Sequence, residues 1–188
     1  LAFSGGYMDA YTYLFRDKVF ANAQTGNIIL FGVNLTSGNF AHAVQYLFPI
    51  LSFMAGVFIA QLMRLRFQRS RKLHWRQLTV LVEIIIMVTV CFLSTSVNLL
   101  ANSLISFACG IQVQSFRKIH GNSLATTMCI GNLRTAIDLL CSFFYTKEKY
   151  LLHKSMFYYG AILTFTVGAV AGKYGIGLLG QGAIAVSA

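Results

Sequence analysis

The longest stretch free of charged side chains constrains this sequence most. It runs for 45 residues from Val19 to Met63, and a second stretch of 40 residues, from Gln77 to Phe116, contains Glu83 alone. A helix needs about 20 apolar residues to cross a bilayer, so each stretch is long enough for two crossings. With 56% hydrophobic residues and a mean hydropathy of +0.65, the chain falls in the membrane class rather than among soluble domains.

Polar, turn-like segments divide these stretches into helices. Residues 34–39 (NLTSGN) and 94–102 (STSVNLLAN) each predict a short loop between two spans. Residues 1–15, 119–146 and 155–177 supply three further spans. The sequence therefore predicts an all-α membrane protein with about seven transmembrane helices, in one transmembrane domain over residues 1–188. Because the first span is short and lacks an initiator Met, we expect further N-terminal residues to complete it, and do not interpret it as a cleaved signal peptide.

Basic residues gather beside the predicted spans. The formal net charge is +10, and six of the fifteen Lys and Arg residues lie between Arg64 and Arg76. The positive-inside rule places this connection in the cytoplasm, which predicts an N-terminus outside and a C-terminus inside the cell membrane. Topology explains the charge without a nucleic-acid partner, although the basic connection could also hold anionic lipid head groups.

Similar segments recur about a hundred residues apart. Aligning the GN dipeptides at Asn27 and Asn132 also pairs glycines upstream and downstream, namely Gly6 with Gly110 and Gly56 with Gly168. The pattern predicts repeat one over about 1–66, a connector helix over about 76–97 and repeat two over about 99–177. Four crossings would separate each helix from its mate, so the expected arrangement is a parallel three-helix internal repeat joined by a central helix, a plan known among small-solute transporters.

Asp9 is the strongest candidate for a functional residue. A carboxylate at membrane depth is costly, which makes it a functional-site hypothesis by default, and Gly5 and Gly6 just before it permit a break or a close helix approach. We expect Asp9 to exchange a proton or bind a cation. The alternative is structural: Asp9 lies near the interface and caps a helix or pairs with Arg16.

The segment NAQTGN offers uncharged polar groups in an otherwise apolar stretch. Asn22, Gln24, Thr25 and Asn27 could line a solute or ion site around a broken helix, as in transporters. Equally, Thr25 and Asn27 could hydrogen-bond between helices while Gly26 allows close packing, which needs no ligand.

The second half carries its own polar candidates. Gln112 and Asn132 lie where the repeat aligns with the first-half site, but Asp9 aligns with Val113, so the carboxylate has no counterpart. Arg134 and Asp138 are four residues apart on one helical face, and we expect them to neutralise one another inside the bundle, with a gating or substrate-carboxylate role as the alternative.

Metal and enzyme chemistry are not indicated by the sequence. The four cysteines lack C-x-x-C spacing and the four histidines fall near different span ends, so we predict no metal site and no cofactor. Nucleophile–base spacing and phosphate-binding loops are also missing, which argues against an enzyme.

The segments GGYMDA at 5–10, FANAQTGN at 20–27 and SFMAG at 52–56 together resemble the YoaK family of bacterial membrane proteins, catalogued as a domain of unknown function. The resemblance covers nearly the whole chain and implies a polytopic inner-membrane protein. In this family the second repeat tends to read G-x-Q-N-A and T-G, whereas this chain has Val113 and Ile130 at the corresponding Asn and Thr positions. That difference favours a site on the first repeat.

Two functional hypotheses follow from these features. The leading one is a secondary transporter or facilitator of a small solute, coupled to a proton or cation through Asp9. The alternative is a non-transporting membrane interaction or scaffold protein that recruits a partner or anionic lipid through its basic connection. Small-xxx-small patterns at Gly56–Ala60 and Gly168–Gly172 are compatible with a homodimer.

Overall fold

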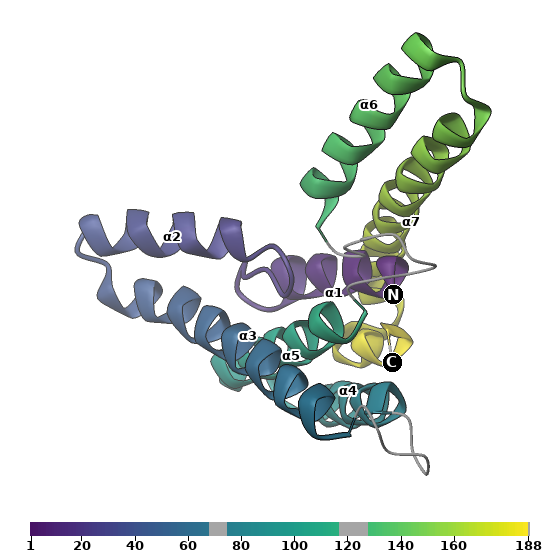
Figure 1. The fold of residues 1–188 in the computed structure, drawn as a ribbon. Helices are drawn as coiled ribbons and strands as arrows, with labels where there is room; N and C mark the ends of the chain where they lie inside the picture. The colour runs from purple at the N-terminus through teal and green to yellow at the C-terminus, as the bar shows by residue number, and fades with distance from the viewer. Residues whose placement is uncertain (68–74, 117–127, 188) are drawn as a thin grey trace.

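The computed structural model describes residues 1–67, 75–116 and 128–187, and these residues are almost entirely helical (Figure 1). The α-helices are α1 (Ala2–Phe15), α2 (Gln24–Thr36), α3 (Phe40–Phe67), α4 (Trp75–Cys91), α5 (Asn98–Ser115), α6 (Cys129–Thr146) and α7 (Lys149–Leu179). Two 3₁₀ segments, η1 (Thr95–Val97) and η2 (Gly180–Ser187), complete the described elements. The all-helical prediction is confirmed for these residues.

The helices at the predicted spans differ in length, and some of them are too short to cross a bilayer. Within the residues that the structure describes, three segments are long and apolar enough to cross a membrane: Phe40–Phe67, Thr95–Ser115 and Lys149–Ser187. Helices α1 and α2 have only 14 and 13 residues. At 1.5 Å per residue each is about 20 Å long, which is shorter than the roughly 30 Å hydrocarbon core of a bilayer.

Two helical hairpins project from a central body. Helices α2 and α3 form one hairpin and α6 and α7 the other, while α1, α4, α5 and η2 pack together between them (Figure 1). Each hairpin has a tight connection with a residue in the left-handed region, Gly38 (φ +74°) in the first and Lys147 (φ +60°) in the second. The core of the body is apolar and includes Met8, Met87 and Ile105.

Glycines set the two closest helix crossings. Helix α1 lies against α7, where Gly6 faces the Phe165 carbonyl and Gly168 faces the Phe3 carbonyl. Helix α5 lies against α3 in the same way, with Gly110 at the Phe53 carbonyl and Gly56 at the Phe107 carbonyl. The small-xxx-small faces are therefore occupied within the chain, and they do not provide the expected surface for a homodimer.

Helices α1 and α5 pass one another in opposite directions. Met8 lies beside Cys109, with 3.8 Å between their sulfur atoms, whereas Arg16 at the end of α1 lies beside Asn102 near the start of α5. Under the predicted parallel repeat these helices would point the same way, so that prediction is wrong for this pair. It assumed that residues 19–33 cross the membrane completely, and α2 is too short for that.

The basic connection is described only in part. Arg64 and Arg66 are exposed on the last turn of α3. Arg69, Arg71 and Lys72, on which the predicted topology also relied, lie outside the described residues.

Candidate functional site

The connection between α1 and α2 is held in place by the TGN segment. Asn27 is fully buried, and its side-chain amide bonds both backbone groups of Phe20: Oδ1 accepts from the Phe20 N–H (3.0 Å) and Nδ2 donates to the Phe20 carbonyl (2.7 Å). Asn27 Nδ2 also donates to Gln24 Oε1, and Gln24 Nε2 donates to the Ala21 carbonyl. An amide carries donors and an acceptor on one planar group, so it can satisfy a backbone segment that belongs to no helix.

This connection turns back along α1, so that α2 begins beside the middle of α1. The Asp9 carboxylate accepts the backbone N–H of Asn22 at 2.7 Å and also interacts with the amides of Ala21 and Ala23. The Asn22 side chain in turn donates to the Gly5 carbonyl at 3.2 Å. Helix α2 has no side-chain cap of its own, so a carboxylate from α1 provides the negative charge that favours a helix N-terminus.

A cavity of 1260 Å³ opens between α1, α2, α6 and α7, and both α2 and α6 begin at its wall. Most of its lining is apolar, including the aromatic rings of Phe53 and Phe165. The polar side chains in the wall are Asp9, Tyr13, Asn22, Gln24, Thr25, Asn132, Thr135, Thr166, Lys173 and Tyr174. An apolar hollow with a few convergent polar groups is the usual form of a small-molecule site.

The structure brings together most of the predicted first-repeat residues. Asp9, Asn22, Gln24 and Thr25 all line the cavity, and Asn132 joins them from α6. Asn27 does not line it, because its amide is committed to the Phe20 backbone. The binding role of these residues stays a prediction.

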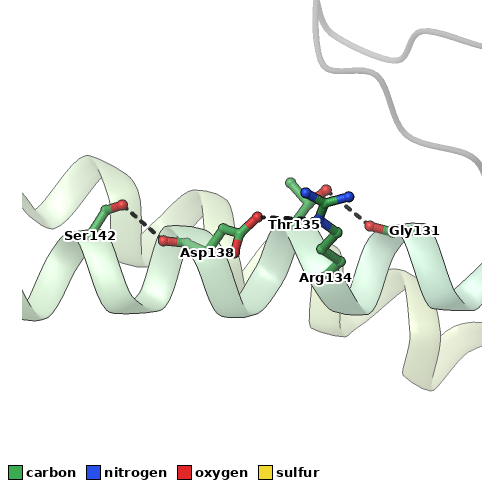
Figure 2. A network of polar contacts seen from close by, with 5 residues as sticks. All are labelled: Gly131, Arg134, Thr135, Asp138 and Ser142. Carbon is green, nitrogen blue, oxygen red and sulfur yellow. Dashed lines mark hydrogen bonds and ion pairs between the residues drawn. The ribbon is translucent and has the colours of Figure 1, made fainter.

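The other second-half candidates lie elsewhere. Gln112, on α5, donates to Glu83 Oε1 of α4 at 2.9 Å. Glu83, the one charged residue of the second long apolar stretch, thus has an amide partner inside the body. Arg134 and Asp138 do form an ion pair, with 3.8 Å between Nε and Oδ2, but both side chains are exposed on α6 (Figure 2). The prediction that this pair lies inside the bundle is wrong.

Arg16, which the sequence suggested as a possible partner of Asp9, is fully buried. Its guanidinium donates to the carbonyls of Val90 (3.3 Å), Leu93 (2.8 Å) and Ser94 (3.1 Å), at the C-terminal end of α4, and to Asn98 Oδ1 (3.0 Å). Leu93 and Ser94 follow closely after the last residue of α4, Cys91, and the C-terminal end of a helix favours a cation. Arg16 therefore joins α1 to α4 and α5, and the suggested pairing with Asp9 is replaced by these contacts.

Several cavity residues were missed from the sequence. Lys173 and Tyr174 are on α7 and Thr135 is on α6, and nothing in their local sequence marks them. Phe53 and Phe165 could have been found, because SFMAG and TFTVG align in the proposed repeat.

Comparison with known proteins gives a family without an assigned activity. The DUF1275 family, described as a protein of unknown function, matches residues 1–188. The chain is 25% identical over 182 residues to the UPF0700 transmembrane protein YoaK of Bacillus subtilis (strain 168), covering 90% of this chain and 78% of that protein. No solved structure matches. Whole-chain coverage, together with the apolar helices, shows that this chain is a membrane protein of the DUF1275 family.

Proposed function

We propose that this protein is a carrier or facilitator that binds a small solute in the cavity between α1, α2, α6 and α7 of the cell membrane. One observation carries the proposal: two helices begin at the wall of one cavity, and a buried carboxylate, Asp9, stands in that wall. Transporters build midplane sites from such interrupted helices because helix ends and unwound backbone offer polar groups that a continuous helix lacks. In this proposal the protein is not an enzyme.

The chemistry of the wall suits a small, partly apolar solute. Aromatic rings provide contact area, while Gln24, Thr25 and Thr135 offer hydrogen-bonding groups. Asn22 Oδ1 is buried and accepts no hydrogen bond within the described residues, so a solute donor could use it. Asp9 would bind a proton or cation together with the solute, since the partners of its carboxylate among the described residues are backbone amides.

The helix crossings of α1 with α7 and of α5 with α3 support an inverted rather than a parallel repeat. Gly6 and Phe165 on one side, and Gly110 and Phe53 on the other, make matching contacts, and α1 and α5 run in opposite directions. We propose that α2 and α6 each begin inside the membrane. Helix α2 would continue in the direction of α1 and leave the membrane on that side, and α6 would likewise continue in the direction of α5. The basic connection after α3 stays cytoplasmic, as the positive-inside rule requires. This arrangement therefore places the N-terminus inside the cell and the C-terminus outside, which reverses the orientation predicted from seven complete crossings.

A ligand screen tests the site. Binding stabilises the native state by mass action, so a bound solute raises the thermal-unfolding temperature of the purified protein. We expect one solute class to stabilise wild type in a way that depends on pH or sodium, and Asp9→Asn to abolish that dependence. Glu148→Gln is the matched control, since Glu148 is an exposed carboxylate outside the cavity. In proteoliposomes we expect the flux of the same solute to be similar for wild type and Glu148→Gln, and to lose its dependence on pH or sodium in Asp9→Asn.

The alternative is a non-transporting interaction protein. It is favoured by the contacts of Asp9 and Asn27, which hold the α1–α2 connection whether or not a solute binds. It predicts that Asp9→Asn changes stability equally with and without every solute, and that no flux exceeds that of empty liposomes. That pair of results would end the carrier proposal.

A further inference from the structure

Helix α4 carries a buried carboxyl group halfway along its length. Glu83 is 6% exposed and lies on the buried face of the helix, which also includes Thr79 and Met87. On the other side of α4, Leu81 and Ile85 are exposed and apolar, as suits a surface in contact with lipid. The carboxyl group of Glu83 is therefore directed into the body.

Glu83 has no Lys or Arg partner among the residues that the structure describes. Its hydrogen bond is with Gln112 of α5, whose Nε2 donates to Glu83 Oε1 at 2.9 Å. Gln112 is 1% exposed, so both members of the pair are buried. A carboxylate buried without a cation is costly, and such a group usually becomes neutral by binding a proton.

The carboxamide of Gln112 has a second polar atom, and that atom lacks a partner. Gln112 Oε1 is buried and accepts no hydrogen bond within the described residues. It belongs to the planar group whose Nε2 is bonded to Glu83, so it lies beside the Glu83 carboxyl group. Most buried acceptors have a donor, and each exception needs a cause. A protonated carboxyl group has the O–H donor that an ionised one lacks.

Asp9 shows the opposite set of partners. Its carboxylate accepts the backbone N–H of Asn22 at 2.7 Å and interacts with the amides of Ala21 and Ala23. These backbone amides are donors, and they suit a carboxylate that only accepts. Glu83 instead faces one donor and one acceptor on the same carboxamide, which suits a neutral carboxyl group.

We propose that Glu83 and Gln112 form a proton-binding site inside the body, in which Glu83 holds the proton and donates it to Gln112 Oε1. Two antiparallel hydrogen bonds would then join the carboxyl group to the carboxamide. Loss of the proton would leave two acceptors facing one another and weaken the contact between α4 and α5. This proposal does not depend on the carrier function, because neither residue lines the solute cavity.

The titratable groups around the pair determine which controls are needed. From α5, Cys109 interacts electrostatically with both Glu83 and Asp9. From α1, the amino group of Leu1 also interacts with Glu83, but Leu1 is 41% exposed and lies outside the buried pair. On α4 itself, Arg76 is two turns away and lies over aromatic rings. The η2 segment has no titratable side chain, and the charged residues of α3 are exposed on its last turn.

Infrared spectroscopy tests the site directly, because a protonated carboxyl group absorbs at a different frequency from an ionised one. The purified protein in liposomes at neutral pH should show a protonated-carboxyl band that shifts in D₂O. We expect Glu83→Gln to remove this band. Asp9→Asn and Cys109→Ser should retain it, and so should Glu148→Gln, which changes an exposed carboxylate.

Thermal unfolding provides a second measurement on the same variants. Glu83→Gln imitates the protonated pair, because two carboxamides can form the same two hydrogen bonds. We expect this variant to unfold at a temperature close to that of wild type at low pH. As the pH rises, wild type should lose stability relative to the variant, since the folded protein holds a proton that the unfolded chain releases. Gln112→Leu should shift the infrared band, because it removes the acceptor of the proton.

Three results would overturn the proposal. The first is a wild-type protein without an exchangeable protonated-carboxyl band at neutral pH. The second is a band that disappears in Asp9→Asn and persists in Glu83→Gln. The third is stabilisation of wild type by sodium that Glu83→Gln abolishes, since an ionised Glu83 would then bind a metal ion in place of a proton.

Discussion

At the scale of single residues, this protein uses its intramembrane polar groups first to hold backbone that is not helical. Asn27 bonds both backbone groups of Phe20, Asp9 holds the start of α2, and Arg16 binds the carbonyls at the end of α4. In lipid every backbone polar group must be satisfied by protein, so an interrupted helix requires such side chains. Asp9, a residue of the proposed solute site, therefore also holds backbone that is not helical.

Arg16→Met should destabilise the protein strongly. The substitution removes a buried cation together with its hydrogen bonds to the Leu93 carbonyl and to Asn98 Oδ1, at an expected cost of about 3 kcal/mol. Thermal unfolding in detergent measures the change, with Arg64→Met, at the exposed end of α3, as the control. Arg16→Lys should recover only part of the loss, because one ammonium group cannot reach all these acceptors. Equal stability of Arg16→Met and Arg64→Met would contradict this account of Arg16.

At the scale of elements, close helix crossings hold the two halves together. Helix α1 meets α7 and α5 meets α3 at glycines, where each backbone faces the carbonyl of the opposite helix. Without an aqueous hydrophobic effect between helices, close packing and polar contacts are the main sources of association in membranes.

Adding a methyl group at these crossings should separate the helices. A Cβ at Gly56 would lie 3.1 Å from the Ile111 nitrogen and closer still to the Phe107 carbonyl oxygen. Gly56→Ala should therefore cost about 1–3 kcal/mol, the usual penalty for overpacking. Gly32→Ala is the matched control, because a Cβ there meets nothing within 4 Å and alanine favours the helix. Denaturant titration in mixed micelles would compare the two, and a control as damaging as Gly56→Ala would refute the packing argument.

At the scale of the whole molecule, the directions of the corresponding helices α1 and α5 determine on which side of the membrane each connection lies. Helices α1 and α5 run in opposite directions, and two hairpins diverge from the central body (Figure 1). An inverted repeat gives each half of a transporter the same structure facing opposite sides of the membrane, which is the basis of alternating access in several folds.

The side of the membrane on which each connection lies distinguishes an inverted repeat from a parallel one. If α2 and α6 begin inside the membrane, the connection at Lys147 lies on the same side as Arg66, whereas seven complete crossings would place them on opposite sides. In a background without native cysteines, Arg66→Cys and Lys147→Cys should both be labelled from the cytoplasmic side by a membrane-impermeant thiol reagent. Labelling of Lys147→Cys from outside would favour the parallel arrangement.

Long uncharged stretches are enough to identify a helical membrane protein, because such stretches have few other stable states and the bilayer sets the length of a crossing. The sequence also identifies Asp9 and the NAQTGN segment as candidates, because polar groups inside apolar stretches are costly unless they bind a partner. Which polar residues meet depends on the tertiary structure. A helical period places Arg134 and Asp138 on one face but does not say that this face is exposed. The sequence likewise does not show that Arg16 is buried against the carbonyl of Leu93, 77 residues away along the chain. Contacts between distant segments depend on helix directions and crossing points, which local sequence patterns do not contain.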